Sequence, residues 1–347
     1  MALLGLSKGV NAVGIVGASG FTGAELMRIC ANHPAFLVKV ATADTQAGTA
    51  VADLYPSLAA EVGDLSYSSY DPDALDGLDV VFAGLPHRAS QGVVADLVGR
   101  VGHVVDLSAD FRFTDPTTYE DWYDTPHDVP ELLDEFSYGL PELFRGEIES
   151  KDHVAVPGCY PTAAALALAP LVRAGVVEQT GVIVDAASGV SGSGRTPKPN
   201  TTFNAVDEDF SAYGLLSHRH TPEIEQATGA QVLFTPHLAP MNRGILATCY
   251  ARPATTLTTA SVLDLLTDFY ADDEFIVVSE RPPSTKATLG SNAAHLTARV
   301  DERTGTVMII SAIDNLGKGA SGQAVQCANI VMKMRETTGL TKAGLYP

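Results

Sequence analysis

The sequence has little cysteine and lacks both paired cysteines and a long apolar run. Its four cysteines, Cys30, Cys159, Cys249 and Cys327, are far apart and form no CxxC pair. A disulfide framework and a structural zinc site are therefore not expected, and a reducing compartment, the cytoplasm, fits best. Because no run of about eighteen apolar residues occurs, no membrane-spanning helix is expected either.

The first ten residues do not have the form of a signal peptide. The apolar run in Met1–Val10 is short and is interrupted by Gly5 and Lys8. A secretory signal needs a longer apolar stretch. We therefore expect no targeting segment there.

Basic residues are also scarce. The chain has 22 basic and 41 acidic side chains, which gives a formal net charge of −19. Such a surface repels phosphate backbones and anionic lipid, so neither nucleic acid nor a membrane is expected as a partner. With these two classes of partner excluded, we expect the protein to act on a small-molecule substrate. The acidity serves solubility or reflects a saline habitat, and the sequence leaves both open.

The 347 residues are 46% apolar and 18% charged, enough for two domains of roughly 100–200 residues each. The first half alternates strand and helix patterns. Strands are predicted at residues 10–16, 37–42, 79–83 and 104–107, and helices at 22–31 and 89–100. This alternation predicts an α/β fold with a doubly wound parallel sheet.

The second half has a different pattern. A strand at 153–156 leads into a helix at 161–173, and a Gly/Ser/Pro-rich loop covers 189–200. Further strands are predicted at 182–186, 232–234, 245–250, 275–278, 295–300 and 307–313, with helices at 259–270 and 321–334. This mixture predicts an α+β domain with a mixed or antiparallel sheet.

A glycine-rich segment follows the first predicted strand and opens the first helix. It consists of Gly17, Ala18, Ser19, Gly20, Phe21, Thr22 and Gly23. Glycine lets the backbone approach a pyrophosphate closely, and a helix N-terminus supplies free N–H groups. The spacing G-x-x-G-x-x-G meets the dinucleotide fingerprint only in part. The segment predicts a dinucleotide site, and a tight turn without a ligand is the alternative.

The end of the second strand leaves the cofactor open. NAD enzymes place an acidic residue there for the ribose hydroxyls, and Asp44 occupies that position. Thr42 and Thr45 are equally placed to bond a 2′-phosphate. This segment alone does not separate NAD from NADP.

The most informative stretch runs from Val156 to Thr162. A strand ends, Pro157 and Gly158 form a turn, and a helix begins near Pro161, so Cys159 lies at a helix N-terminus. The field there favours a thiolate and predicts a lowered pKa for Cys159. A thiolate attacks acyl groups readily. We interpret the other three cysteines as buried structural residues.

A second segment carries two histidines just before a predicted helix start at Thr221 and Pro222. His218 and His220 there suit general acid–base chemistry near neutral pH. A metal pair is the alternative, but no third imidazole or thiolate lies nearby, and we predict no metal site.

Taken together, these segments resemble the N-acetyl-gamma-glutamyl-phosphate reductase family, a relative of aspartate-semialdehyde dehydrogenase. The resemblance rests on eight motifs in order, at 17–23, 85–87, 106–112, 138–142, 156–162, 188–195, 218–223 and 314–322. It covers residues 11–335. It implies NADPH-dependent reduction of N-acetyl-L-glutamyl 5-phosphate to the 5-semialdehyde in arginine biosynthesis, with release of phosphate.

The resemblance also assigns roles. Cys159 matches the nucleophile and His220 the acid–base residue. The glycine loop and Asn315 match the cofactor side, and the family generally uses NADP; Thr42 is predicted on the same side. Arg112, His218 and Glu223 match the substrate side, where Ser188 and Arg195 are predicted as well. Arg112 or Arg195 is expected to grip a carboxylate or phosphate, with a local basic patch around them.

The resemblance further implies a dinucleotide-binding domain of residues 1–157 and 314–347, with the last helix returning to it. Residues 158–313 would then form the catalytic and oligomerisation domain of a homodimer or homotetramer. The alternative within the enzyme class is reduction of a carrier-protein-linked aminoadipyl phosphate in lysine biosynthesis. A non-catalytic dinucleotide sensor is the alternative outside it, and Cys159 and His220 argue against that.

Overall fold

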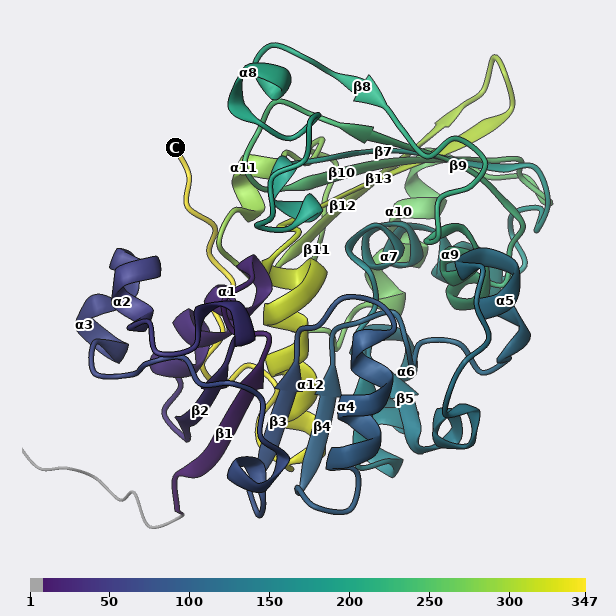
Figure 1. Ribbon diagram of the computed structural model, residues 1–347. Coiled ribbons are helices and arrows are strands. Elements are labelled where there is room, and N and C mark those ends of the chain that lie inside the picture. Colours follow the sequence, from purple (N-terminus) through teal and green to yellow (C-terminus); the bar gives the residue numbers. More distant parts are fainter. Residues whose placement is uncertain (1–8) are drawn as a thin grey trace, which may run out of the picture.

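The computed structural model describes residues 9–347, so the expectation for Met1–Val10 lies almost wholly outside the described residues. The chain forms two sheets that lie one above the other in Figure 1. The first has the order β2-β1-β3-β4-β6-β5, and all of its neighbouring strands are parallel. Its strands are β1 (Asn11–Val16), β2 (Phe36–Thr42), β3 (Val80–Ala83), β4 (His103–Asp106), β5 (Phe136–Tyr138) and β6 (His153–Ala155).

Helices cover both faces of this parallel sheet. On one face α1 (Phe21–Ala31) and α12 (Gly322–Val331) share an apolar cluster with β1 and β3. On the other face α4 (Ala89–Leu97) and α5 (Thr117–Tyr123) contribute to a second cluster. Further helices of this half are α2 (Val51–Leu54), α3 (Ala59–Val62) and α6 (Pro141–Ser150). The predicted doubly wound parallel sheet is confirmed.

The second sheet is mixed, with the order β11-β12-β13-β10-β7-β9-β8. Pairs β7·β9 and β11·β12 are parallel, and the others are antiparallel. Its strands are β7 (Val182–Ser188), β8 (Ser211–Ala212), β9 (Val232–Leu238), β10 (Ile245–Ala251), β11 (Ile276–Val278), β12 (Ala294–Asp301) and β13 (Thr306–Ile313). The predicted mixed sheet of the α+β half is confirmed as well.

Side chains of the mixed sheet alternate between buried and partly exposed along β7, β9 and β10, as one-sided packing requires. The buried face packs on α7 (Cys159–Arg173), α9 (Thr221–Thr228) and α10 (Thr259–Phe269). Helix α7 lies between the two sheets and is buried from Tyr160 to Val172. Two short helices, α8 (Phe203–Val206) and α11 (Thr285–Thr288), belong to the loops of this half.

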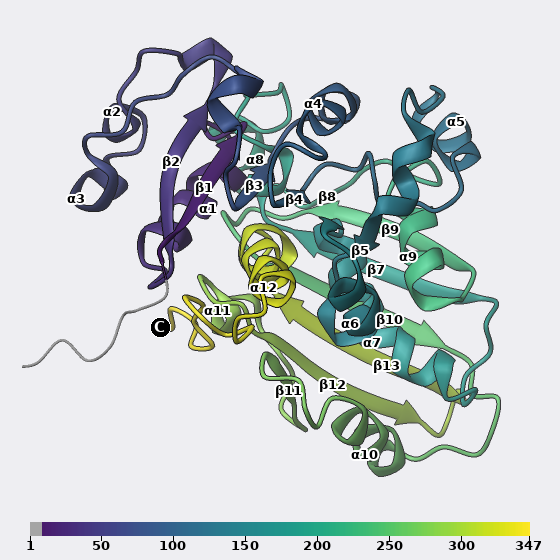
Figure 2. The same ribbon diagram turned by 90° about the horizontal axis from the view of Figure 1, so that it is seen from below.

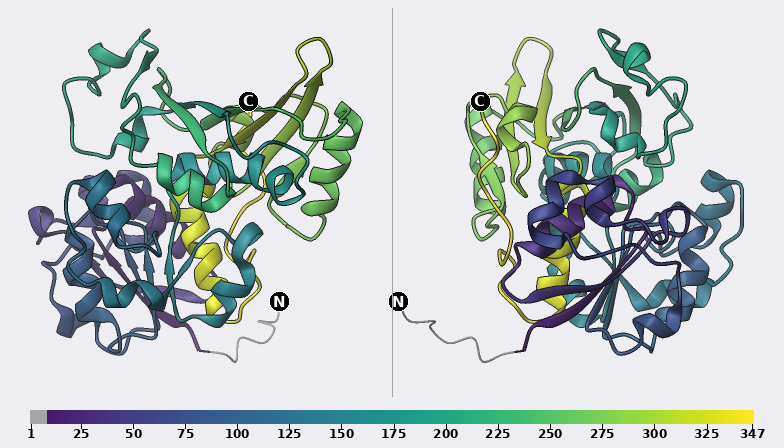
Figure 3. Two further views of the ribbon diagram at one scale, coloured as in Figure 1. Left: turned by 90° about the vertical axis from the view of Figure 1, so that its right-hand side faces the viewer. Right: turned by 60° about the vertical axis from the view of Figure 1, so that its left-hand side comes forward.

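After β13 the chain returns to the first sheet. A π-helical turn, Gly317–Ser321, precedes α12, which packs against α1, α6 and β4. In Figure 2 this yellow helix is viewed nearly along its axis near the centre of the molecule, and Figure 3 shows the two lobes with α12 in the lower one. The last helix begins within one residue of the predicted start but ends at Val331, before the predicted end at 334, and Lys333 just beyond it has φ +57°. Among residues 9–347, no helix is long and apolar enough to cross a bilayer.

Candidate active site

The glycine loop connects β1 to α1, and close packing requires glycine at its first and last positions, Gly17 and Gly23. Gly17 has φ +79°, and a Cβ there would lie 2.4 Å from the carbonyl oxygen of Gly84. The backbone carbonyl of Thr42 accepts the N–H groups of Gly17 (3.1 Å) and Ala18 (2.9 Å). The loop is thereby fixed against the end of β2.

The loop faces a cavity of about 800 Å³ that reaches Cys159. Gly17, Ser19, Gly20, Phe21 and Thr22 line this cavity, as does Asn315. Ala18, Gly23 and Thr42 do not line it, and the Ala18 and Thr42 side chains are buried. These three residues therefore shape the loop from behind the cavity wall.

The start of α1 suits an anion. Gly20 is its N-cap, no side chain caps it, and no acidic residue lies in its first turn. The first N–H groups of a helix have no partner within the helix, and here they border the cavity. The residues present therefore fit the pyrophosphate of a dinucleotide.

Opposing charges lie on this cavity near the end of β2. Asp44 and Thr45 line it, and Asp44 Oδ1 accepts the backbone N–H of Tyr70 at 2.8 Å. Arg195, from the loop after β7, also lines it. Burial raises the pKa of Tyr55, and the charge of Arg195 opposes that rise. The Tyr55 hydroxyl donates to Ser19 O at 2.8 Å, so Tyr55 lies against the glycine loop. Arg195 is close enough to affect the pKa of Tyr55, and it therefore lies near the loop as well.

Cys159 is the first residue of α7, two residues earlier than the predicted start, with Gly158 as N-cap. The turn before it is anchored by Glu223 on α9. Glu223 Oε1 accepts the Gly158 N–H at 2.8 Å and the Tyr138 hydroxyl at 2.9 Å, and its Oε2 accepts Arg112 Nη1 at 3.1 Å. Glu223 is fully buried and borders neither this cavity nor the substrate cavity described below.

The predicted lowering of the Cys159 pKa is wrong. Burial raises the pKa of Cys159 to about 11, although the backbone N–H of Tyr160 and the charge of Arg112 oppose the rise. The cause is tertiary packing. Gly319 in the π-helical turn lies so close that a Cβ there would be 2.9 Å from the Cβ of Cys159. Desolvation of the thiolate thus outweighs the helix N-terminus.

His220 packs on the turn that carries Cys159. A Cβ at Gly158 would lie 2.5 Å from His220 Nε2. Burial holds the pKa of His220 well below its usual value, and the charges of Arg112 and Arg219, and of His218 when it is protonated, act in the same direction. His220 is therefore neutral near pH 7 and can accept a proton. Its Nδ1 is buried and has no hydrogen-bond partner among the described residues.

His218 lies beside His220. Its Nδ1 accepts the backbone N–H of His220 at 3.2 Å, and the two rings lie 4.8 Å apart. Burial and the charge of Arg219 lower the pKa of His218 to about 4. Both histidines are therefore uncharged in the resting site.

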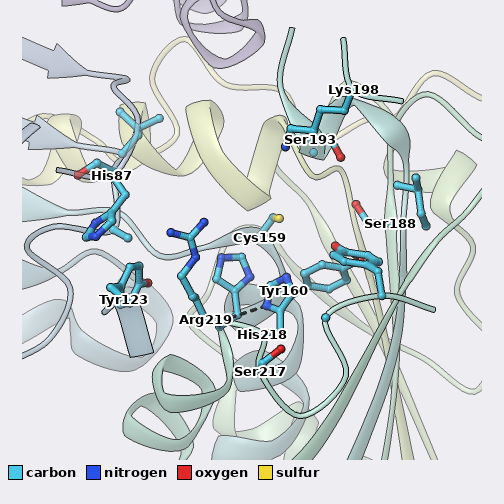
Figure 4. A pocket seen from close by; sticks show the side chains of 18 of the residues that line it. His87, Tyr123, Cys159, Tyr160, Ser188, Ser193, Lys198, Ser217, His218 and Arg219 are labelled. Carbon is cyan, nitrogen blue, oxygen red and sulfur yellow. Dashed lines mark hydrogen bonds between the residues drawn. The ribbon is translucent and has the colours of Figure 1, made fainter. Parts of the chain in front are cut away.

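A second cavity, of about 480 Å³, lies on the other side of Cys159 (Figure 4), and we call it the substrate cavity. Both Cys159 and His220 border this cavity and also the larger cavity beside the glycine loop, which we call the cofactor cavity. Ser188 lines the substrate cavity too, and its hydroxyl donates to Gly189 O at 3.0 Å. The two cavities meet at the cysteine, so groups bound in each would come together there.

The predicted basic patch is present but consists of different residues. Lys198 and Arg219 line the substrate cavity. Arg112 and Arg195 line the cofactor cavity but not the substrate cavity. Arg112 is buried and neutralised by Glu223, and its Nε donates to Val156 O at 2.8 Å. The position of Arg219 between the two histidines was the signal that could have identified it from sequence.

The sequence places His87 in the motif at residues 85–87 but does not show what supports its side chain. His87 contacts the carboxylate of Asp110, which is fully buried and accepts the Arg88 N–H. Asn315, predicted on the cofactor side, borders that cavity. Its Oδ1 accepts the Gly244 N–H at 2.7 Å and its Nδ2 donates to Ser191 Oγ at 2.9 Å. Among residues 9–347, no group of three or more metal-ligating side chains is found.

Comparison with known families places both halves of the chain. Residues 12–151 match the NAD-binding domain of semialdehyde dehydrogenases, and residues 159–315 match the dimerisation domain of the same enzymes. N-acetyl-gamma-glutamyl-phosphate reductase of Symbiobacterium thermophilum is 48% identical, over 96% of this chain and 99% of that protein. The reductase of the same name from Desulforudis audaxviator is 46% identical, with the same coverage of both chains.

Solved structures show the same fold at low sequence identity. Aspartate semialdehyde dehydrogenase II from Vibrio cholerae, complexed with ASA, superimposes with a TM-score of 0.70 at 14% identity, covering 94% of this chain and 99% of that one. The aspartate semialdehyde dehydrogenase with NADP from Candida albicans gives a TM-score of 0.66 at 16% identity, covering 93% and 98%. These likenesses establish the fold.

Proposed function

The chain belongs to the N-acetyl-gamma-glutamyl-phosphate reductase family, and we propose that Cys159 is the nucleophile of its reaction. The enzyme reduces N-acetyl-L-glutamyl 5-phosphate to N-acetyl-L-glutamate 5-semialdehyde and releases phosphate, a step of arginine biosynthesis. The cofactor is NADPH. The observation that carries the proposal is the position of Cys159, on a helix start where the cofactor and substrate cavities meet.

The first step is thioester formation. The sulfur of Cys159 attacks the acyl carbon, the carbon–oxygen bond to phosphate breaks, and phosphate leaves. Because burial keeps the thiol protonated and His220 neutral, the thiol proton passes to His220 as the bond forms. The site works as a thiol and general base and not as a preformed ion pair.

NADPH, when bound, supplies the hydride that reduces the thioester. His220 then returns its proton to the oxyanion of the hemithioacetal, and release of the aldehyde regenerates the Cys159 thiol. Backbone N–H groups at the start of α7 are placed to stabilise the oxyanion. We propose that Glu223 and Arg112 hold the Cys159 turn and that His218 orients His220.

On the cofactor side, we propose that the glycine loop residues 17–23 and Asn315 bind or shape the dinucleotide, with Thr42 supporting the loop through its carbonyl. Arg195 lies near the loop and is proposed to face the cofactor. Ser188 borders the substrate cavity and is proposed to face the substrate. Except for Arg195, this division follows the proposed domains: residues 1–157 with 314–347 form the cofactor side, and residues 158–313 form the substrate side.

A homodimer is proposed through the outer face of the mixed sheet. The helices of this half pack on its inner face, whereas Leu233 and Ile183 on the outer face are 49% and 38% exposed. The match to a dimerisation domain supports this, and a tetramer would require further contacts. A Leu233→Asp variant that elutes as a smaller species than the wild type would support the interface. Unchanged elution would contradict it.

We also propose a cytoplasmic location. All four cysteines are unpaired, and Cys159 must remain reduced to act. The free N-acetylglutamyl substrate is favoured over a carrier-linked aminoadipyl phosphate, because the relatives at 44–48% identity bear the name of the former reductase.

The reverse reaction tests the proposed function directly. N-acetylglutamate semialdehyde, phosphate and NADP are incubated with the wild type and with Cys159→Ala. We expect phosphate-dependent formation of NADPH by the wild type and none by the variant. Absence of activity with this aldehyde in the wild type, at both low and high salt, would contradict the assignment.

A further inference from the structure

Two cationic side chains face the substrate cavity without an acidic partner. They are Arg219 and Lys198, and no aspartate or glutamate lines this cavity. Within residues 9–347, the charged groups of both side chains form no ion pair or hydrogen bond. In a chain with 41 acidic and 22 basic residues, such cations are available for an anionic ligand.

Arg219 is held in place by a stack of side chains. Its guanidinium carbon lies 5.1 Å from the centre of the Tyr123 ring, a cation–π distance. Tyr123 in turn packs on His87, with ring centres 4.3 Å apart, and His87 contacts the buried carboxylate of Asp110. Figure 4 shows Arg219 extending into the cavity from its lower side, with His87 and Tyr123 beside it.

The wall that carries this stack is itself fixed. Both carboxylate oxygens of Asp110 accept the backbone N–H of Arg88, at 3.0 and 2.9 Å. Arg88 has φ +72°, which is unfavourable for a residue with a side chain. Strained backbone of this kind persists where surrounding contacts hold it, and it is common at ligand sites. Asp110 therefore presents the stack to Arg219 in a fixed place.

Lys198 approaches the cavity from another side. It belongs to the loop after β7, which also carries Ser193, and both residues border the cofactor cavity as well as the substrate cavity. Arg219 borders only the substrate cavity. In Figure 4, Cys159 lies between Lys198 with Ser193 on one side and Arg219 on the other.

The substrate has two anionic groups at opposite ends. The acyl phosphate must lie beside the Cys159 sulfur where the two cavities meet, and the α-carboxylate lies at the other end of the carbon chain. We propose that Lys198 with Ser193 binds the phosphate, and that Arg219 binds the α-carboxylate. The planar guanidinium suits a bidentate carboxylate, and the ammonium suits a phosphate as a point charge. This assignment rests on the proposed function.

Steady-state kinetics of the reverse reaction separate the two roles. For Arg219→Gln we expect kcat/KM for N-acetylglutamate semialdehyde to fall roughly 10- to 100-fold, as for a lost charged hydrogen bond. The KM for phosphate should change little. Lys198→Gln should instead raise the KM for phosphate. Arg303→Gln, on the exposed β12–β13 turn, removes the same charge elsewhere and should alter neither value.

A substrate without the carboxylate makes the test specific. 4-Acetamidobutanal is N-acetylglutamate semialdehyde with the α-carboxylate removed. The wild type should discriminate against it by about the same roughly 10- to 100-fold factor, and Arg219→Gln should discriminate little. If Arg219→Gln keeps the full discrimination, or if Lys198→Gln leaves the KM for phosphate unchanged, the assignment is wrong. Loss of phosphate-dependent activity in the wild type would instead refute the proposed function.

Discussion

Replacement of Glu223 by glutamine tests how the Cys159 turn is held. The carboxylate accepts hydrogen bonds from Arg112, Tyr138 and Gly158 in a fully buried place. In Glu223→Gln, one oxygen remains for Tyr138 and Gly158, but an amide N–H₂ then faces the Arg112 guanidinium. A buried charge that loses its partner costs about 3–5 kcal/mol. We expect the free energy of unfolding to fall by that amount.

The assay is urea unfolding followed by circular dichroism, combined with the reverse reaction. The matched control is Glu225→Gln on the same helix, since Glu225 accepts a single backbone N–H, that of Val232 at 3.0 Å. The control should lose no more than about 1 kcal/mol. Because the turn shifts, Glu223→Gln should also lose kcat, on the order of 100-fold. A Glu223→Gln variant as stable and as active as the control would refute the reasoning.

Three further predictions concern protons and the cofactor. Since burial raises the pKa of Cys159 to about 11, the rate of iodoacetamide alkylation of the free enzyme should still be rising above pH 9, and a plateau near neutral pH would contradict this. Burial lowers the pKa of His218 in the folded protein to about 4, whereas in the unfolded chain the imidazole is protonated near pH 6.5. The free energy of unfolding should therefore fall by about 3 kcal/mol as the pH drops from about 6.5 to about 4, at 1.36 kcal/mol per pKa unit. Urea unfolding at several pH values should show that His218→Asn lacks this pH-dependent loss. Asp44→Asn removes a carboxylate from the cofactor cavity. Because this removes about 1 kcal/mol of repulsion from the 2′-phosphate, the KM for NADPH should fall about fivefold. An equal change in the KM for NADH would show that Asp44 does not face that phosphate.

Local signals in the sequence were sufficient for the strand–turn–helix elements of the site. The glycine loop and the turn at Pro157 and Gly158 each combine a strand end with residues that favour a turn, and both are where the sequence predicts them. Short elements were missed. Strand β5 has only Phe136–Tyr138, and its burial comes from pairing with β6 and not from an alternating pattern.

Properties that depend on distant segments could not be predicted. Burial raises the pKa of Cys159, and Gly319, which packs against it, lies far along the chain. The partner of Arg112 is Glu223, and only the fold shows that this ion pair removes Arg112 from the free cations. Arg219 likewise gains its place from Tyr123 and from the His87 contact with Asp110, which no local pattern connects.

Formation of a thioester on Cys159 is the central claim, and it can be observed without turnover. The enzyme is mixed with N-acetylglutamyl phosphate in the absence of NADPH, quenched in acid, digested and examined by mass spectrometry. We predict an N-acetylglutamyl group on the peptide that contains Cys159, with release of one equivalent of phosphate, and no such adduct in Cys159→Ala. Phosphate release without an adduct, or an adduct on Cys30, Cys249 or Cys327, would contradict the account.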